Sequence, residues 1–389
     1  MAKGKPSIFG RRELAKSTLL GGTSFILGRG ASPERQGHAG REFMDVRQFG
    51  AVGDGKADDT KAIQRAIDAA AEVQGAVFVP PGAYLCADIQ LRPDTALVGI
   101  PTWNYRAPGG TVLRLANGEA KCLLNITGAW GCTIDGLALA GGGLGKNVHG
   151  IFLNKPDYGK REDAFRIERC QVARFSGDGV NLTRAWCFSV RHSMLAHNRG
   201  DGLSLRGWDG FLLDNWFSGN RRAGFAARDE NASVTFTSNR VEWNGQENLL
   251  ITGADGYQIT GNFLDRAGTC GIALRNGHES CSQMTITGNF LKRSGKLANP
   301  DSHDSAQLLI EGARGVTCTG NNLQVWQDDN RKGTFSPSYG IVYKGLQDCV
   351  ISNNVLYEGA IRQLLVDLGE HGEGVVIKDN PGRLFKVGR

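Results

Sequence analysis

One asparagine recurs along most of the chain, each time at the end of a short β-type run. The seven are Asn215, Asn239, Asn262, Asn289, Asn321, Asn354 and Asn380. The intervals between them are 24, 23, 27, 32, 33 and 26 residues. Repeats of this length with short strands are typical of a solenoid, in which each coil stacks on the previous one. We therefore expect the asparagine side chains to form a column and to hydrogen-bond from coil to coil at a bend.

The residues around each asparagine predict which side chains point inward. Mostly apolar residues stand three positions before it and two positions after it. The first set is Leu212, Phe236, Ile259, Ile286, Cys318, Ile351 and Ile377, and the second is Phe217, Val241, Leu264, Leu291, Leu323 and Leu356. The same frame extends backward with Ser193, Cys170 and Leu137 at the asparagine position. Because strands that stack coil over coil must be parallel, the sequence predicts an all-β parallel β-helix of about ten coils.

A second strand column follows each asparagine after a short turn. Its runs are HGIFL (149–153), DGVNL (178–182), DGLSL (201–205), AGFAA (223–227), ENLLI (247–251), CGIAL (270–274), AQLLI (306–310), YGIVY (339–343) and RQLLV (362–366). Successive side chains of a strand point to opposite faces. The third and fifth residues of each run are therefore expected to point inward, and the first, fourth and sixth to line an outer face.

Residues 45–86 precede the coils and predict a cap. DGKADDT is a turn followed by a helix N-cap, and five residues then form an apolar helix face. These residues are Ala62, Ile63, Ala66, Ile67 and Ala70. AVFVPPGAYLC predicts two strands joined by a turn. We expect residues 45–100 to form an N-terminal cap and the first coils, because an uncovered solenoid end exposes a strand edge.

This opening, together with the asparagine-bearing coils, resembles the pectate-lyase-like right-handed parallel β-helix superfamily. Within it, the rhamnogalacturonase-type and epimerase-type branch is the most similar. The resemblance covers residues 45–389 and implies a right-handed helix. It also implies that the protein acts on, or binds, a polysaccharide, and it allows a homotrimer.

The N-terminus carries most of the positive charge. Residues 1–36 contain seven basic and two acidic residues, net +5, so of the total of +6 only 6 − 5 = +1 remains for residues 37–389. This balance gives no argument for nucleic-acid binding. Arg11 and Arg12 precede a short apolar stretch that is too short to span a bilayer. The pattern predicts a twin-arginine export leader over residues 1–36 and a periplasmic or extracellular protein without a membrane segment after leader removal. A basic tail is the alternative.

Residues 37–389 are expected to form a single β-helix domain. Its nine cysteines are odd in number and irregularly spaced, which is not typical of a disulfide framework or a zinc site. Cys270 and Cys281 flank one coil and are the candidates for a disulfide in an oxidising compartment.

Three acidic or basic residues hold the first outer position of successive strands: His149, Asp178 and Asp201. Neighbouring strands are about 4.8 Å apart, which would bring the two carboxylates to about the spacing of a retaining glycosidase. Asp178 and Asp201 are therefore candidates for acid/base and nucleophile, with His149 beside them as a substrate contact. Asp-Gly is also a common turn pair, and a purely structural role in the turn is the stronger alternative for both aspartates.

The sixth position of the same strands carries several cations. Arg206, Arg228, Arg275 and Lys344 form a candidate groove for an acidic sugar chain, because guanidinium groups hold carboxylates in bidentate fashion. A solvated charged face is the alternative.

Two long insertions, 292–306 and 326–339, precede this strand face. Within them His303, with Asp304 beside it, suits a general base, and Tyr339 suits a proton donor that also contacts substrate. Such a pair fits a lyase or epimerase, which removes the proton next to a uronate carboxylate. The Asp301-Ser302-His303-Asp304 run partly matches the Asp-Pro-His-Asp element of carbon-5 uronan epimerases. Four aspartates are candidate calcium ligands instead: Asp301, Asp304, Asp328 and Asp329. An ordinary solvated loop is the third alternative.

The sequence thus predicts an exported enzyme that cleaves glycosidic bonds in an acidic or plant-derived polysaccharide, with Asp178 and Asp201 as the first choice of site. A polysaccharide lyase or carbon-5 uronan epimerase that uses the same groove is the second hypothesis. A glycan-binding β-helix protein without catalysis is the third. The sequence identifies no required cofactor, and calcium is the candidate ion. The Asn-Thr-Asp, Asp-Asp, Gly-His-Gly and Arg-Ile-Lys elements of polygalacturonases are not found in register.

Overall fold

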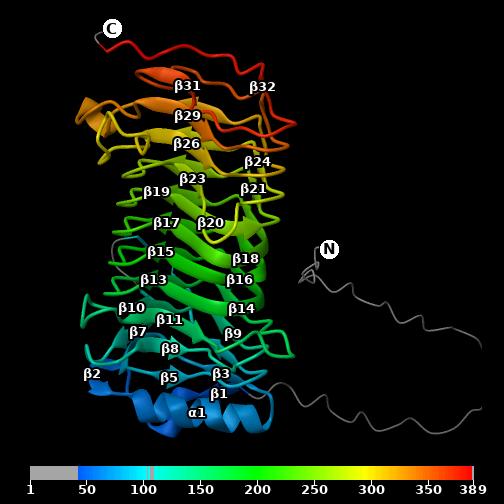
Figure 1. Ribbon diagram of the computed structural model, residues 1–389. Coiled ribbons are helices and arrows are strands. Elements are labelled where there is room, and N and C mark those ends of the chain that lie inside the picture. Colours follow the sequence, from blue (N-terminus) through cyan, green and yellow to red (C-terminus); the bar gives the residue numbers. More distant parts are fainter. Residues whose placement is uncertain (1–42, 103, 106–108, 388–389) are drawn as a thin grey trace, which may run out of the picture. The chain divides into compact units, whose positions relative to one another are not determined.

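The computed structural model describes residues 43–102, 104–105 and 109–387, which stack as the coils of a parallel β-helix (Figure 1). Every pairing between its named strands is parallel, and the two sheets contain 21 and 11 strands. We call them sheet A and sheet B. The predicted leader, residues 1–36, lies outside the described residues. No helix among the described residues has the length and apolar character needed to cross a membrane.

Sheet A holds most of the strands. They are β1 (Phe43–Asp45), β3 (Ala76–Phe78), β5 (Ile89–Gln90), β6 (Ala96–Val98), β8 (Cys122–Asn125), β9 (Thr133–Asp135), β11 (His149–Asn154), β12 (Arg166–Glu168), β14 (Val180–Arg191), β16 (Leu203–Leu213), β18 (Phe225–Thr237), β20 (Leu249–Asp255), β21 (Gln258–Thr260), β23 (Ile272–Arg275), β24 (Thr285–Thr287), β26 (Ala306–Glu311), β27 (Thr317–Thr319), β29 (Tyr339–Lys344), β30 (Val350–Ser352), β31 (Gln363–Asp367) and β32 (Val376–Lys378).

Sheet B consists of shorter strands, of which the last five directly follow Asn215, Asn239, Asn262, Asn289 and Asn321. Its strands are β2 (Asp54–Asp58), β4 (Gly82–Cys86), β7 (Thr111–Leu115), β10 (Ala138–Ala140), β13 (Gln171–Ala173), β15 (Met194–Ala196), β17 (Trp216–Ser218), β19 (Arg240–Glu242), β22 (Phe263–Asp265), β25 (Phe290–Lys292) and β28 (Asn322–Gln324). Eleven coils therefore carry a strand of sheet B, close to the ten that the sequence predicts.

The predicted asparagine column is confirmed over its whole length. The side-chain amide of each asparagine donates to the side-chain oxygen of the asparagine one coil further on, at 2.8–3.2 Å. The same oxygen accepts the backbone N–H of the previous asparagine. Ser193 begins the column, because its backbone N–H donates to Asn215. The backbone groups at this corner of each coil are thereby satisfied inside the protein.

A second asparagine column, which the sequence patterns did not reveal, stands at another corner. Asn198, Asn220 and Asn244 are buried, and their side chains bond from coil to coil at 3.0 Å. Asn248 ends it by accepting from Asn244 at 2.9 Å. This column spans too few coils to stand out as a repeat in the sequence.

One hydrophobic cluster fills the β-helix from Val46 to Leu356 and contains the predicted inward residues of all but the last coil, where Leu364 and Ile377 are partly buried and pack against it. Two details of the strands differ from prediction. In the middle coils β14, β16 and β18 are single long strands that cover both the second-column run and the run before the asparagine. In the last coil the register is displaced by one residue, so Val366 lies opposite Val342, in a separate apolar cluster, instead of facing inward.

The predicted cap is confirmed by α1 (Thr60–Glu72), which lies across the N-terminal end of the stack (Figure 1). Its buried residues are the five that the helical spacing singled out. The DGKAD segment forms β2 instead of a turn, and the Asp59 carboxylate accepts the backbone N–H groups of Val52 and Gly53 at 2.7 and 3.1 Å. Two 3₁₀ helices complete the elements, η1 (Val46–Phe49) and η2 (Asp329–Arg331).

The suggested disulfide is wrong. Cys270 and Cys281 are both free thiols, and each lies against backbone carbonyls of its own surroundings. Cys270 contacts the carbonyl oxygens of His303 and Asp304, and Cys281 contacts those of Ile251 and Arg275.

Candidate active site on the outer face of sheet A

The two aspartates chosen first for catalysis are buried turn residues. Asp178 precedes β14, and its carboxylate accepts the backbone N–H of Asp201 at 2.8 Å. Asp201 precedes β16, and its carboxylate accepts the backbone N–H of Ala223 at 2.9 Å. Asp178 is 7% exposed and Asp201 is 0% exposed. The expectation that both line an open groove is therefore wrong, because each carboxylate faces the backbone of the next coil.

His149 is also enclosed and does not form a surface contact for substrate, contrary to prediction. It is 6% exposed, and its Nδ1 accepts the backbone N–H of Asp178 at 3.1 Å. Its ring stacks on Phe152 with 5.5 Å between centroids. Burial lowers the pKa of His149, and the Asp178 carboxylate opposes this shift. A neutral ring with Nδ1 as acceptor is consistent with both observations.

The predicted row of cations lies on the outer face of sheet A, but each member has an acidic partner. Arg206 pairs with Glu230 at 2.9 Å, Arg228 with Asp201 at 2.6 Å and Lys344 with Glu370 at 2.9 Å. Arg275 pairs with Asp304 at 2.5 Å and with Glu311 at 3.3 Å. The row is therefore a series of partly exposed ion pairs. A polymer carboxylate must compete with these partners, which the sequence alone did not reveal.

Aromatic side chains accompany this row at its N-terminal part. Tyr158 stacks on Trp208 with 4.1 Å between ring centroids. The Tyr158 hydroxyl donates to the backbone oxygen of Glu230 at 3.2 Å, and burial raises the pKa of this tyrosine to about 12. Tyr343, the fifth residue of the YGIVY run, points into the hydrophobic cluster as that pattern predicts and is 6% exposed. Tyr343 is therefore not available to a sugar.

His303 and Tyr339, predicted as a proton-transfer pair, are brought together by the two insertions. Their rings make an edge contact with 5.2 Å between centroids. The contact depends on backbone pairing, because the Tyr339 N–H donates to the Ser305 oxygen at 2.9 Å. The Ser338 N–H donates to Ser305 Oγ at 3.1 Å, which holds the second insertion against the first. Both rings are partly exposed, His303 in the loop that leads into β26 and Tyr339 as the first residue of the neighbouring strand β29.

Guanidinium groups flank this pair. Arg275 is ion-paired with Asp304, next to His303 in the chain. Arg362 is ion-paired with Asp301 and is exposed. Its pKa is raised by the Asp301 carboxylate and by a hydrogen bond with the Tyr339 side chain. The strand predictions did not select Arg362, although it begins the RQLLV run just as Tyr339 begins the YGIVY run.

The four suggested calcium ligands do not form one set. Asp301 and Asp304 pair with Arg362 and Arg275 as described. Asp328 and Asp329 lie with other cations on the outer face of sheet B. Across the described part of the chain, no three His, Cys, Asp or Glu side chains converge as a metal site requires. The residues present therefore do not fit the calcium hypothesis.

Sheet B carries a buried ionic cluster that no sequence pattern indicated. Asp265 is 0% exposed and receives two hydrogen bonds from Arg293, at 2.7 and 2.5 Å, and another from Arg266. Burial raises the pKa of Asp265, and Arg293 opposes the shift. The same arginines contact Asp329, and Lys296 contacts Asp328. We call Asp265, Arg266 and Arg293 the ionic anchor, because it ties both long insertions to sheet B.

Comparisons with known proteins agree with this architecture. A family model described as rhamnogalacturonase A/epimerase, pectate lyase-like, matches residues 43–110, and one described as a right-handed β-helix region matches residues 123–291. The mannuronan C5-epimerase AlgE3 of Azotobacter vinelandii is 30% identical over 232 residues, which are 54% of this chain and 12% of that protein. Alginate lyase 7 of the same organism is 32% identical over 207 residues, 46% of this chain and 23% of that protein.

Solved structures show the same fold. The A-module of the A. vinelandii mannuronan C-5 epimerase AlgE6 superposes with a TM-score of 0.67 at 19% identity, covering 88% of this chain and 100% of the module. The DFA-IIIase of Arthrobacter chlorophenolicus A6 without its lid superposes with a TM-score of 0.62 at 14% identity, covering 88% of this chain and 99% of that chain. At these identities the likeness establishes the fold alone.

Proposed function

Because the chain belongs to the pectate-lyase-like right-handed parallel β-helix superfamily, we propose that it acts on an acidic polysaccharide by transferring a proton next to a uronate carboxylate. The reaction is that of a polysaccharide lyase or a carbon-5 uronan epimerase. The observation that carries the proposal is the contact between His303 and Tyr339. Arg275 and Arg362 accompany the pair through their ion pairs with Asp304 and Asp301. Relatives named as mannuronan epimerases and an alginate lyase support the same class of chemistry.

Each residue of the site has a role in this proposal. Arg362 and Arg275 bind the uronate carboxylate and stabilise the negative charge that develops on it. His303 accepts the proton from the carbon next to the carboxylate. In a lyase, the released electron pair forms the carbon–carbon double bond, and the glycosidic oxygen leaves with a proton from the Tyr339 hydroxyl. In an epimerase, Tyr339 returns a proton to the opposite face of the same carbon and the chain stays intact.

Glycoside hydrolysis at Asp178 and Asp201 is not retained, because Asp201 is completely enclosed and ion-paired with Arg228. Carboxylate catalysts must flank the scissile bond. A buried residue in a turn cannot do so.

The test is an assay on polymannuronate, polyguluronate and polygalacturonate with three readouts. These are the ultraviolet absorbance of an unsaturated product, reducing ends, and deuterium uptake at carbon 5 in heavy water. We expect His303→Gln and Tyr339→Phe to lower the rate by about 10²- to 10⁴-fold, which is usual for loss of a general acid or base. His278→Gln and Tyr357→Phe are the matched controls, since both side chains are exposed and lie in other coils.

The readouts separate the hypotheses. Ultraviolet absorbance indicates a lyase, and deuterium uptake without new ends indicates an epimerase. Full activity in both His303→Gln and Tyr339→Phe would place the chemistry elsewhere. Reducing ends without ultraviolet absorbance, lost in Asp178→Asn, would restore the hydrolase hypothesis. Binding of a polymer that is never altered would favour a glycan-binding protein.

Export is a separate proposal that depends on the Arg11-Arg12 pair. Fusion of residues 1–36 to a reporter protein that folds before export should deliver it across the membrane only with an intact twin-arginine pathway. Delivery that is unchanged in the Arg11→Lys, Arg12→Lys double variant would contradict a twin-arginine leader.

A further inference from the structure

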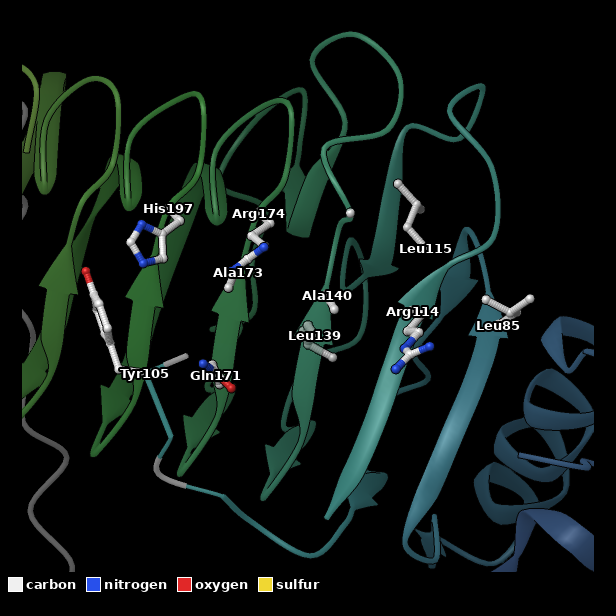
Figure 2. Close-up of a pocket in the computed structure, with 11 residues that line it drawn as sticks. Leu85, Tyr105, Arg114, Leu115, Leu139, Ala140, Gln171, Ala173, Arg174 and His197 are labelled. Carbon is white, nitrogen blue, oxygen red and sulfur yellow. The ribbon is translucent and has the colours of Figure 1, made fainter. Parts of the chain in front are cut away.

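A cleft of about 360 Å³ lies on the outer face of sheet B, in its N-terminal half (Figure 2). Its floor is a trough of small side chains, because Ala140 and Ala173 are register partners and Ala140 also pairs with Arg114. Leucines from neighbouring positions complete the apolar lining. Tyr105, from the segment before β7, closes one end of the cleft (Figure 2).

Tyr105 is held in place by three contacts. Its ring stacks on Trp216 at 5.0 Å and lies tilted against His197 at 4.8 Å between centroids. Its hydroxyl is 3.1 Å from Ser218 Oγ. An aromatic ring fixed at the end of an apolar trough is suited to contact the C–H face of a sugar ring.

The cleft has cations without counter-charges. Arg114 and Arg174 line it, both are exposed, and no carboxylate lies in its lining. Neither arginine has an ion pair within the described ranges, whereas Arg206, Arg228 and Arg275 on sheet A are all paired. Two unpartnered guanidiniums beside an apolar floor form a site for a carboxylate group.

Gln171 supplies a hydrogen-bond acceptor that has no partner. It is 5% exposed, and its Nε2 donates to the Asn104 backbone oxygen at 2.7 Å. This bond leaves Oε1 buried and without a hydrogen bond among the described residues. An unsatisfied buried acceptor costs free energy, and a hydroxyl group in the cleft would remove that cost.

His197 adds a polar edge without adding a positive charge. Burial and the nearby Arg174 guanidinium both lower the pKa of His197. The neutral ring can donate a hydrogen bond to a hydroxyl group through one nitrogen and accept one from a hydroxyl group through the other.

We propose that this cleft binds one carboxylate-bearing sugar residue. The sugar ring lies on the Ala140–Ala173 floor against Tyr105, and its carboxylate contacts Arg114 and Arg174. One of its hydroxyl groups donates a hydrogen bond to Gln171 Oε1. The choice of an acidic sugar as ligand rests on the proposed function, but the contacts do not require the reaction. The Ala140–Ala173 floor lies five to six coils from His303, roughly 24–29 Å along the axis at about 4.8 Å per coil, and on the other sheet. The cleft is therefore a polymer-binding site that is separate from the proposed catalytic pair, His303 and Tyr339.

The test is titration calorimetry with a mannuronate trimer at physiological ionic strength, using the full chain with His303→Gln so that the probe is not consumed. We expect saturable binding that weakens about tenfold or more in Arg174→Gln and in Arg114→Gln, because each removes a charged hydrogen bond. Arg199→Gln is the matched control, since this exposed arginine is close in sequence but does not line the cleft.

A second readout locates the site. Trp216 stacks on Tyr105, so the trimer should change tryptophan fluorescence, and Trp216→Phe should abolish the change. Equal binding of neutral mannotriose, equal affinity for inorganic sulfate, or unaltered affinity in both arginine variants would overturn the proposal. If the unaltered protein turns over polymer but the trimer does not bind at the cleft, the proposed reaction stands and the proposed binding site is wrong. If the trimer binds at the cleft but no polymer is turned over, the binding site stands and the proposed reaction is wrong.

Discussion

Each asparagine of the main column serves the backbone of two neighbouring coils. Asn321 is 0% exposed, and its amide donates to the Ile286 oxygen at 2.9 Å and to Asn354 Oδ1 at 2.8 Å. Its own oxygen accepts the N–H and the side-chain amide of Asn289, both at 2.9 Å. An alanine at this position leaves buried donors and acceptors on both neighbours without partners.

We expect Asn321→Ala to lower the free energy of unfolding by about 2–4 kcal/mol, since each stranded buried polar group costs about 1–3 kcal/mol. Asn322→Ala is the matched control, because Asn322 is the next residue and is exposed. Asn322→Ala should change the free energy of unfolding by no more than about 0.5 kcal/mol. Urea unfolding followed by circular dichroism measures both. Equal effects of the two substitutions would contradict a specific role of the column.

The buried His149–Asp178 contact makes stability depend on pH. Burial lowers the pKa of His149 below the ordinary histidine value of about 6.5. The unfolded chain therefore binds this proton more readily than the folded protein. The stability contributed by the neutral ring is complete above about pH 6.5 and is lost as the pH falls below that value.

We therefore expect the melting temperature of the protein to fall between about pH 7 and pH 5, and this fall to be smaller in His149→Gln. His192→Gln serves as the control, because His192 is exposed. Calorimetry across this pH range measures the slope. An identical slope in His149→Gln and the unaltered protein would assign the acid sensitivity to other groups.

At the scale of elements, the two long insertions are positioned by sheet B as well as by sheet A. The ionic anchor of Asp265, Arg266 and Arg293 reaches Asp329, and Asp328 reaches Lys296. The Trp243 ring contacts both cations of this region, with the Arg266 guanidinium 4.2 Å and the Lys296 ammonium 5.3 Å from its centroid. These contacts hold the bases of the loops that carry His303 and Tyr339.

Removal of the central carboxylate should loosen both loops. In Asp265→Ala, Arg266 and Arg293 stay buried without their main partner, and we expect a loss of about 3–5 kcal/mol in the free energy of unfolding. Hydrogen exchange should increase first in residues 293–305 and 326–338. Asp214→Asn, at an exposed carboxylate, should change stability by less than about 1 kcal/mol. Undisturbed exchange in both loops would show that the anchor does not position them.

At the scale of the whole molecule, one apolar cluster runs through the stack, and nearly all thiols are buried. Eight of the nine cysteines are buried, and Cys187 is partly exposed. Burial raises the pKa of Cys122, Cys170 and Cys318 to about 12. Protonated, enclosed thiols do not react as nucleophiles.

Native protein at about pH 8 should therefore react with a thiol reagent at no more than one cysteine, because only Cys187 is accessible. Unfolding in guanidinium without a reductant should release nine reactive thiols. Only seven would indicate a disulfide, such as Cys270–Cys281, in the isolated protein. Fast labelling of several thiols before unfolding would indicate that the coils open locally.

The sequence by itself determined the repeat. The asparagine spacing, the inward apolar residues and the apolar face of the cap helix all depend on short-range periodicity, which is readable in one chain. The repeat also showed that the two long insertions, which carry His303 and Tyr339, both precede the same strand face. The sequence also indicated that the recurring Asp-Gly pairs could form turns, which is the role that Asp178 and Asp201 have in the structure.

Only the tertiary structure decided which polar groups reach solvent. Asp201 turns inward because the next coil offers it the Ala223 N–H and the Arg228 guanidinium. Arg206 pairs with Glu230, and Lys344 pairs with Glu370. Each acidic partner is about 25 residues further along the chain, and no sequence pattern links it to its cation. The cleft ends at Tyr105 because this ring packs against Trp216 and His197, which lie about a hundred residues away in the chain. Contacts between coils depend on register and side-chain direction in three dimensions, which spacing along the chain does not determine.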